Sequence, residues 1–360
     1  MSLLFVVAAA AVVAAATYAA CPCKSPSWCE SIKTGPRKEV LGFTTKSDHW
    51  PHYDWSKVTT LALFHDIDNA TMDLVCYAHS KGVRVVNHGN FDVADLLNAT
   101  ARAAFVSDQI SVATANYLDG VNIDIESPLN STAMRAALVE LVAETRRAFA
   151  EAIPGSQISY DVAWSPDCID GRCYDAVGLA RVTDFLVVMS YDERSQIWGP
   201  CVASANSPLP MTARGIEEYM NLGIDPYQLV LGQPWYGYDY NCSSLDAVGL
   251  CSLKHVPFRG APCSDAAGVE RDYAVVRQML KNSTRVWNET FSAPFFNYVA
   301  PVDGKTHQVW YDDPESLALK YRYGVDVGLR GLAFWTVDSL DYSSTEGQGD
   351  AKAMWDAVVV

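Results

Sequence analysis

Residues 118–155 read LDGVNIDIESPLNSTAMRAALVELVAETRRAFAEAIPG, and this stretch predicts one buried strand followed by one long helix. Its first part, residues 120–126, alternates apolar and polar side chains, as a strand does when its two faces meet different surroundings. From about Thr132 to Ile153 the apolar residues recur every three or four positions, which predicts an amphipathic helix. A Pro-Gly pair ends that helix. The stretch is therefore one strand–helix unit.

Short apolar runs like the one at Gly120–Glu126 recur along the chain, and each predicts a strand. The others are Val40–Thr44, Thr59–Phe64, Val83–Asn87, Ile158–Trp164, Phe185–Asp192, Leu229–Pro234 and Gly331–Trp335. Eight buried strands joined by helices predict an α/β fold, the closed (β/α)8 TIM barrel, with a doubly wound open sheet as the alternative. The long interval before the last strand predicts an insertion between strands 7 and 8, at about residues 236–311, above the end of the barrel where active sites lie.

The composition is that of a globular protein with a sizeable core, because 49% of the 360 residues are hydrophobic and 19% are charged. The chain has 27 Lys and Arg against 42 Asp and Glu, which gives a net charge of −15. Such a charge repels phosphate backbones and anionic membrane surfaces. We therefore expect no nucleic-acid partner and no membrane partner, and we expect a monomer.

The N-terminus has the pattern of a targeting segment. Residues 1–20 carry no charged side chain, and Thr17 and Ala19 stand where a cleavage site needs small residues. This predicts a secretory signal peptide over residues 1–19 and a single domain over residues 20–360. A membrane anchor is the alternative, but the segment is rich in alanine and only weakly hydrophobic.

Cysteines and glycosylation sequons support the secretory route. An even count of 10 cysteines favours disulfides in an oxidising compartment, with Cys168–Cys173 and Cys242–Cys251 as short-range candidates. A structural zinc site is the alternative, but paired CxxC spacing and an HExxH motif are missing from the sequence. Asn-X-Ser/Thr sequons predict N-glycosylation at Asn69, Asn98, Asn130, Asn241, Asn282 and Asn288.

The strand at residues 120–126 carries the candidate chemistry. Asn122, Asp124 and Glu126 project from one face, while the intervening Val and Ile residues project from the other. A barrel interior is usually filled with branched apolar side chains, so two carboxylates and an amide there are costly unless they are paired or functional. A solvent-facing edge strand is the alternative. Because Glu126 comes at the C-terminal end of its strand, we favour a catalytic site.

Residues 119–126, DGVNIDIE, resemble the DGxDxDxE signature of glycoside hydrolase family 18, the chitinase family, with Asn122 in place of the first Asp of the DxDxE triplet. The resemblance extends to PWYGYDYNC at 234–242, PFRGAPCSDAAG at 257–268, HQVWYDDPESLALK at 307–320 and the cysteine pattern at 21–29, so it covers essentially the whole mature chain.

The resemblance implies a barrel glycosidase that hydrolyses the β-1,4 GlcNAc-GlcNAc (chitobiose) bond of free N-glycan core oligosaccharides and releases the reducing-end GlcNAc. It also implies a lysosomal location, with secretion from the cell as the alternative. No cofactor and no metal are implied.

The positions of the two carboxylates bear on the mechanism. Asp124 and Glu126 leave one strand on the same side, so they are unable to flank a sugar as the two carboxylates of most glycosidases do. In the family the nucleophile is the 2-acetamido oxygen of the substrate. The resemblance therefore makes Glu126 the general acid and base, and Asp124 the residue that orients the acetamido group. We expect Asn122 to belong to the substrate-binding residues and to hydrogen-bond Asp124 without taking up a proton, and so to alter the pH profile.

A second motif, MSYD at residues 189–192, matches the MxYD motif of the family. The resemblance implies that Tyr191 holds the acetamido carbonyl and takes part in catalysis. Met189 and Asp192 are expected to line the same substrate subsite. For Met189, packing inside the barrel is the alternative.

Aromatic residues supply the remaining candidates. Trp335 matches the tryptophan on which the family stacks the sugar, since an indole face suits the apolar face of a pyranose. We expect Trp235 and Tyr236 to contact substrate as well, with core packing as the alternative. A secreted endochitinase acting on chitin is the rival enzyme. A chitin-binding lectin is the rival outside the enzyme class, although such lectins typically lose the acid that Glu126 provides.

Overall fold

A closed barrel of eight parallel strands forms the centre of the molecule, in the order β1-β15-β7-β6-β5-β4-β3-β2. The computed structural model describes residues 21–129, 131–301 and 303–360, so the predicted signal peptide lies outside the described residues. The barrel strands are β1 (Glu39–Thr44), β2 (Thr60–Leu63), β3 (Arg84–Gly89), β4 (Gly120–Ile123), β5 (Gln157–Ala163), β6 (Phe185–Met189), β7 (Leu229–Pro234) and β15 (Gly331–Trp335). The predicted barrel is confirmed and the doubly wound sheet is wrong, although β4 and β6 each end earlier than expected.

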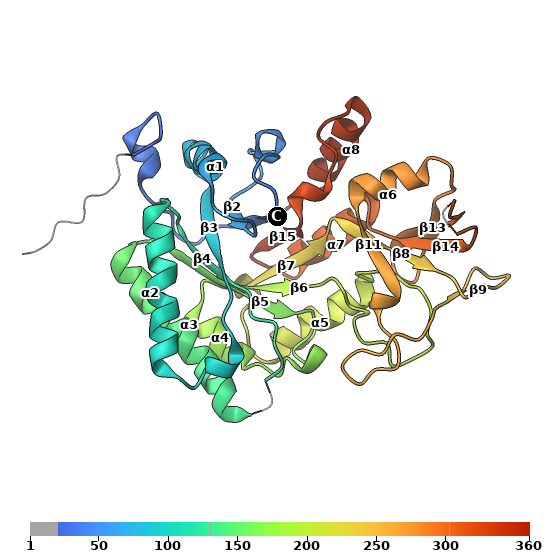
Figure 1. Cartoon of the computed structure of the whole chain (residues 1–360), viewed down its shortest axis with the longest axis horizontal. Coiled ribbons are helices and arrows are strands. Elements are labelled where there is room, and N and C mark those ends of the chain that lie inside the picture. Colours follow the sequence, from blue (N-terminus) through green and yellow to red (C-terminus); the bar gives the residue numbers. More distant parts are fainter. Residues whose placement is uncertain (1–20, 130, 302) are drawn as a thin grey trace, which may run out of the picture.

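Helices cover the outside of the barrel (Figure 1). They are α1 (Asn69–Ser80), α2 (Ala99–Ala115), α3 (Thr132–Ala152), α4 (Ala176–Val182), α5 (Leu209–Asn221), α7 (Pro314–Asp326) and α8 (Thr345–Asp356). The predicted long helix is α3, which begins where the Ser131 hydroxyl accepts a hydrogen bond from the Met134 backbone N–H at 3.2 Å. Such a cap satisfies a backbone donor that the first turn leaves free.

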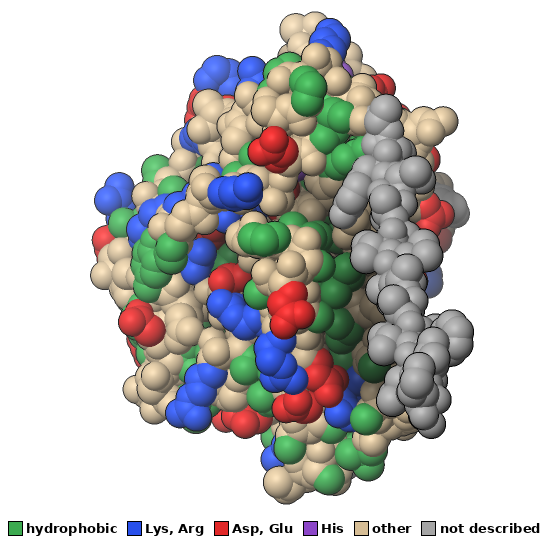
Figure 2. All heavy atoms as spheres, turned by 90° about the vertical axis from the view of Figure 1, so that its left-hand side faces the viewer, with side chains coloured by type: hydrophobic (Ala, Val, Ile, Leu, Met, Phe, Trp, Pro, Cys, Tyr) green, Lys and Arg blue, Asp and Glu red, His purple; other side chains and the backbone are tan. Residues whose placement is uncertain are grey.

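The face that carries α2 and α3 shows basic and acidic side chains interspersed (Figure 2). Arg102 of α2 forms an ion pair with Glu144 of α3 at 2.9 Å, and Arg147 pairs with Glu140 within α3 at 3.1 Å. Mixed charge of this kind gives no concentrated field of one sign on this face.

The two faces of β4 meet different surroundings, as the alternation predicts. Val121, Ile123 and Ile125 are buried in the large apolar cluster that also holds Leu138 and Leu141 of α3. The opposite face of the barrel strands holds a second, smaller cluster, made of Leu41, Phe43, Ala62, Val86, Phe185, Val187, Val230 and Ala333. The polar residues of β4 therefore point into the barrel.

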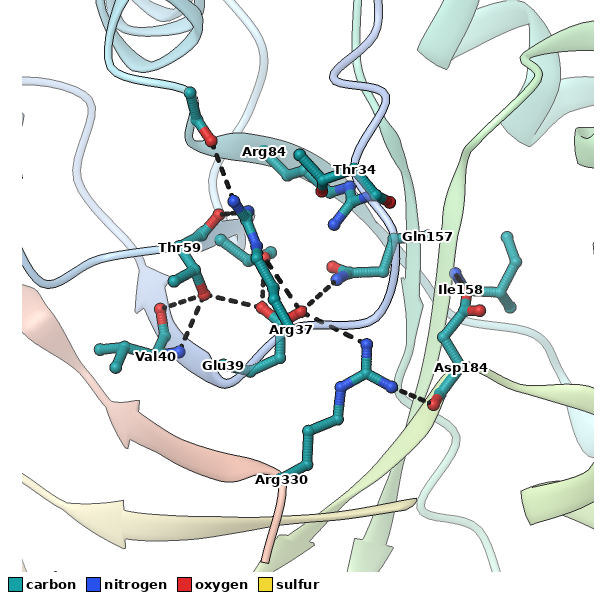
Figure 3. Close-up of polar contacts among 12 residues, drawn as sticks. Thr34, Arg37, Glu39, Val40, Thr59, Arg84, Gln157, Ile158, Asp184 and Arg330 are labelled. Atoms are coloured by element: carbon teal, nitrogen blue, oxygen red, sulfur yellow. Dashed lines mark hydrogen bonds and ion pairs between the residues drawn. The ribbon is translucent and has the colours of Figure 1, made fainter. Parts of the chain in front are cut away.

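A network of paired charges fills the N-terminal end of the barrel (Figure 3). Glu39, at the start of β1, is fully buried and accepts hydrogen bonds from the hydroxyls of Thr59 and Thr60 at 2.7 and 3.1 Å. Arg330 lies 3.5 Å from the Glu39 carboxylate and donates to the Asp184 backbone carbonyl at 2.7 Å. Because barrel chemistry belongs to the opposite end, this network has a structural role.

The segment between β7 and α7 forms a separate antiparallel sheet beside the barrel (Figure 1). Its strand order is β11-β8-β14-β13-β12. The elements of this segment are β8 (Tyr236–Asn241), β9 (Ser244–Leu245), β10 (Cys251–Ser252), β11 (Gly268–Asp272), α6 (Tyr273–Leu280), β12 (Val286–Asn288), β13 (Ala293–Val299) and β14 (Thr306–Trp310). Since β8 starts directly after the carboxyl end of β7, the sheet borders the end of the barrel where active sites are built.

Disulfides join the 10 cysteines of the chain in pairs. Cys168–Cys173 and Cys242–Cys251 are among them, which confirms both short-range predictions. The other pairs are Cys21–Cys29, Cys23–Cys76 and Cys201–Cys263. Within the described ranges, the helices are all too short or too polar to cross a bilayer.

Candidate active site

The carboxyl end of β4 presents three polar side chains at increasing exposure. Asn122 is fully buried, the Asp124 side chain is 17% exposed and the Glu126 side chain is 52% exposed. Although β4 ends at Ile123, the Asp124 backbone N–H still donates to the Gly89 carbonyl of β3 at 2.8 Å. The amide therefore lies beneath the two carboxylates, and Glu126 is at the mouth of the barrel.

Asn122 does not hydrogen-bond Asp124, and its complete burial keeps it from contacting substrate, so both expectations for this residue are wrong. Its Nδ2 donates to the Ser159 hydroxyl at 3.0 Å and to Asp161 Oδ1 at 2.8 Å, both on β5. The strand register sets Asn122 directly beside Ser159, so the amide turns sideways to the neighbouring strand. Asp161 is 2% exposed, and this burial, together with the charge of Asp124, raises the pKa of Asp161 well above its usual value.

One carboxylate oxygen of Asp124 is buried without a hydrogen-bond donor among the described residues. Its Oδ1 is buried and has no hydrogen-bond partner in the described part of the chain. Its Oδ2 lies 3.7 Å from Nε2 of His88, whose ring stacks on Phe64 with 4.1 Å between the ring centroids. A buried acceptor without a donor costs free energy. Within the described ranges, Asp124 Oδ1 therefore lacks the donor that would offset the cost of its burial.

Glu126 forms an ion pair with Arg172, a residue that the sequence did not single out. Arg172 also contacts Asp170 at 3.1 Å, and its side chain is 9% exposed. Partial burial and the charge of Asp124 raise the pKa of Glu126, while the charge of Arg172 opposes that rise. The net result is a carboxyl group that holds its proton more readily than an ordinary glutamate, as a general acid requires.

The last residue of β6 and two residues that follow the strand line a cavity together with Glu126. Met189 and Tyr191 are 8% and 9% exposed. Asp192 has a left-handed backbone, with φ of 50°, and its Oδ1 accepts hydrogen bonds from the hydroxyls of Tyr236 at 2.5 Å and Tyr238 at 2.9 Å. Burial raises the pKa of Asp192, and the two tyrosine hydrogen bonds oppose the rise. Asp192 thus ties the barrel to β8 of the inserted sheet.

Two adjoining cavities form the cleft, and Glu270 of β11 lines both. The first has a volume of about 540 Å³ and is lined by Glu126, Asp170, Arg172, Met189, Tyr191, Asp192, Ser195, Tyr238, Phe258, Asp265, Ala266, Gly268, Val269 and Glu270. The second has a volume of about 380 Å³ and is lined by Thr45, Tyr236, Glu270, Arg271, Asp272, Val275, Trp335, Thr336 and Ser339. The volumes are those of a cleft for small molecules.

Trp335 and Trp235 have opposite roles. Trp335, at the end of β15, lines the second cavity and packs against Phe43 with 5.3 Å between the ring centroids. Trp235 is fully buried, stacks on Phe334 at 4.5 Å and donates its indole N–H to the Tyr321 hydroxyl at 3.1 Å. The expectation that Trp235 contacts substrate is therefore wrong, because consecutive side chains point in opposite directions and only the next residue reaches the cleft.

Several charged residues in or beneath the cleft were not predicted from the sequence. Asp161 had a usable signal, because Ile158–Trp164 alternates and places an acidic residue on the inward face. Arg172 had a weaker one, since a close pair of cysteines marks a tight loop around it. Asp265 and Glu270 belong to the insertion, and no local sequence pattern predicts how the insertion packs against the barrel. Burial raises the pKa of Asp265 to about 8.

Two groups of three ligand-type side chains lie close enough together to hold a metal ion within the part of the chain that the structure describes. Both groups contain cysteines that are joined in disulfides, which leaves no thiolate for a metal. Neither group includes a residue that lines the cleft.

Comparison with known proteins identifies the family. Residues 85–339 match the glycosyl hydrolases family 18. The chain is 45% identical over 342 residues to mouse (Mus musculus) di-N-acetylchitobiase, which covers 94% of this chain and 92% of the relative. It is 44% identical over 347 residues to human (Homo sapiens) di-N-acetylchitobiase, and the alignment covers 94% of this chain and 88% of the human protein.

The fold agrees with this match. A class V chitinase mutant from Nicotiana tobaccum, solved in complex with NAG4, superposes with a TM-score of 0.72 at 21% identity, over 90% of this chain and 99% of that one. With a family match over most of the chain and two relatives aligned over nearly all of it, this protein belongs to glycoside hydrolase family 18 and is a glycoside hydrolase.

Proposed function

We propose that this protein hydrolyses the β-1,4 bond between the two GlcNAc residues of chitobiose, in the free core oligosaccharides of degraded N-glycans, and releases the reducing-end GlcNAc. The names of the mouse and human relatives support this substrate. The observation that carries the proposal is the arrangement at the end of β4. There the half-exposed Glu126 stands beside Asp124, whose buried Oδ1 has no donor among the described residues.

Substrate binding uses the aromatic and polar groups of the cleft. The apolar face of the sugar on the non-reducing side stacks on the Trp335 indole. The 2-acetamido N–H donates to Asp124 Oδ1, and the Tyr191 hydroxyl donates to the acetamido carbonyl. Burial and the charge of Asp161 raise the pKa of Tyr191 well above its usual value, so this phenol keeps its proton. Met189, Asp192 and Tyr236 complete the walls of the cleft.

The first chemical step breaks the glycosidic bond. Glu126 gives its proton to the glycosidic oxygen, which takes the electron pair of the bond as the reducing-end GlcNAc leaves. The acetamido oxygen forms a bond to the anomeric carbon in its place, and the product is an oxazolinium ion. Asp124 stabilises the positive charge that develops on the acetamido group.

The second step restores the enzyme. Glu126, now a carboxylate, takes a proton from water as that water attacks the anomeric carbon, and the bond from the acetamido oxygen breaks. Two displacements at one carbon retain the configuration of the sugar. Since the nucleophile belongs to the substrate, the reaction needs no second carboxylate on the opposite face and no cofactor.

The protein works as a monomer in the lysosome, which it reaches through the secretory pathway, with the extracellular space as the alternative. Five disulfides support an oxidising route, because such bonds persist in secretory compartments. Asn69, Asn98 and Asn282 of the predicted sequons are exposed. Burial raises the pKa of the cleft carboxyls Asp192 and Glu270, which suits an acidic lumen.

Product analysis tests the substrate. GlcNAc oligomers with an isotopic label at the reducing end are incubated with the protein at acidic pH, with intact and with chemically blocked reducing ends. We expect labelled single GlcNAc to appear first and to disappear when the end is blocked. Glu126→Gln is the matched control, and it is expected to abolish turnover while it spares binding.

Other outcomes would assign a different function. Internal cleavage that ignores the blocked end would make the protein an endochitinase acting on chitin. Binding of the oligomers without any cleavage by the unaltered protein would make it a lectin.

A further inference from the structure

The loop between β5 and α4 packs directly on the segment that carries Glu126. The Cys168–Cys173 disulfide closes this loop, and the Leu129 backbone N–H donates to the Gly171 carbonyl at 3.0 Å. Asp170 is held from outside the loop, because its N–H donates to the Gln196 side chain at 3.0 Å and its Oδ1 accepts from the Ser195 hydroxyl at 3.0 Å. The loop is therefore fixed at several points.

The same loop contacts the backbone on both sides of Glu126 and also the Glu126 side chain. The Tyr174 hydroxyl contacts the carbonyls of Ile125 and Ser127, one on each side of Glu126, both at 2.7 Å. Two residues earlier, Arg172 forms the ion pair with the Glu126 carboxylate. The loop therefore keeps the Arg172 guanidinium beside the Glu126 carboxylate, and the ion pair does not rely on a freely moving side chain.

Arg172 is a positively charged residue in a cavity lined by acidic side chains. Of the described residues that line the first cavity, it carries the only positive charge. The charged groups that face Glu126 are Asp124 after β4, Asp192 after β6, and Asp170 and Arg172 on the loop. The three aspartates favour the protonated form of Glu126, and Arg172 favours the carboxylate.

We propose that Arg172, held by the Cys168–Cys173 loop, is a positioning residue that confines the activity of Glu126 to acidic solution. The inference rests on the acid role of Glu126 in the proposed function. An arginine stays charged at every relevant pH, so it stabilises the carboxylate that Glu126 becomes when it protonates the leaving group. Glu126 therefore gives up its proton more readily, but it stays protonated only at lower pH than it would without Arg172.

The pH dependence of kcat/KM tests this proposal. Arg172→Gln removes the charge and keeps a polar side chain, so the alkaline limb, where Glu126 loses its proton, is expected to move up by about one pH unit. That is the low end for a neighbouring opposite charge, because Glu126 is half exposed and water screens it. Arg172→Lys retains the charge and is expected to return the limb most of the way. Arg147→Gln, an equal change of charge on the exposed face of α3, is the matched control and leaves the limb in place.

A direct titration separates this proposal from the proposed function. The Glu126 carboxyl is followed by ¹³C NMR in the unaltered protein and in Arg172→Gln, with the signal assigned by its loss in Glu126→Gln. A midpoint that rises in Arg172→Gln supports the claim that Arg172 favours the Glu126 carboxylate even if oligomer hydrolysis is absent, in which case the proposed function fails and this claim stands. An unchanged midpoint and an unchanged alkaline limb would overturn it.

The role of the disulfide has its own variant. Cys168→Ser combined with Cys173→Ser loosens the loop, and the alkaline limb is expected to move in the same direction as in Arg172→Gln but by less. A folded double variant whose limb coincides with that of the unaltered protein would overturn the claim that the disulfide holds Arg172 on Glu126.

Discussion

Asp124→Asn removes the negative charge that, in the proposed mechanism, stabilises the positive charge developing on the acetamido group. The substitution keeps the size of a side chain that is 17% exposed. If the acetamido N–H donates to Oδ1, the positive charge of the oxazolinium ion lies about 4 Å from the carboxylate, where an effective dielectric constant of about 20 gives an attraction of about 4 kcal/mol. A loss of that size lowers kcat by about 1000-fold.

The assay must separate kcat from KM. The charge exists only after the acetamido oxygen has attacked, so we expect KM to change by less than about threefold. Initial rates on reducing-end-labelled chitotriose give both constants, and a thermal melt checks that the variant folds. A fall in kcat of less than tenfold, or a loss that appears mainly in KM, would contradict this prediction, since Asp124 would then act on the bound ground state.

Three further predictions concern binding, stability and pH. Trp335→Ala is expected to raise KM about tenfold by loss of stacking, whereas Trp235→Phe lowers the melting temperature and leaves KM unchanged; steady-state kinetics and melts that showed the reverse would exchange their roles. Burial lowers the pKa of His79, but the hydrogen bond to Asp119 at 2.8 Å and the Asp119 charge outweigh it and raise the pKa. The stabilisation by protonated His79 is complete below the pKa of about 6.5 in the unfolded chain, and it is lost as pH rises through the higher pKa in the folded protein. His79→Gln should therefore lower the melting temperature more at pH 5 than at pH 8.5. Equal losses at the two pH values would contradict this. The pKa of Asp161 is already raised, so Asn122→Asp makes a buried pair of carboxyls that needs a second proton to stay neutral on folding. Denaturant titrations should show a destabilisation that starts near pH 4 and grows by up to about 1.4 kcal/mol per pH unit until the second carboxyl ionises, and a loss independent of pH would contradict it.

The barrel and the residues of β4 were predictable because they depend on local periodicity. Alternation along one strand decides which side chains face inward, and that is sufficient for Asn122, Asp124 and Glu126. Repeated strand–helix units then predict the closed sheet. These features need no knowledge of which distant segments touch.

The wrong or missing predictions concern residues whose contacts are made with distant segments of the chain. Asn122 has two N–H groups, and their acceptors belong to β5, which no pattern within β4 reveals. Trp235 lies at the junction of β7 and β8, where the direction of each side chain depends on how the inserted sheet leaves the barrel. Arg172 reaches Glu126 only because its loop folds back over the end of β4.

The most direct test of the account asks whether the substrate supplies its own nucleophile. Chitotriose is compared with an analogue that carries trifluoroacetamido groups in place of acetamido groups, and kcat is measured for both at the same acidic pH. Fluorine withdraws electrons from the amide oxygen, so attack by that oxygen predicts a fall in kcat of several orders of magnitude with little change in binding. A kcat within a few-fold of that for chitotriose would contradict the account, because the nucleophile would then have to belong to the protein.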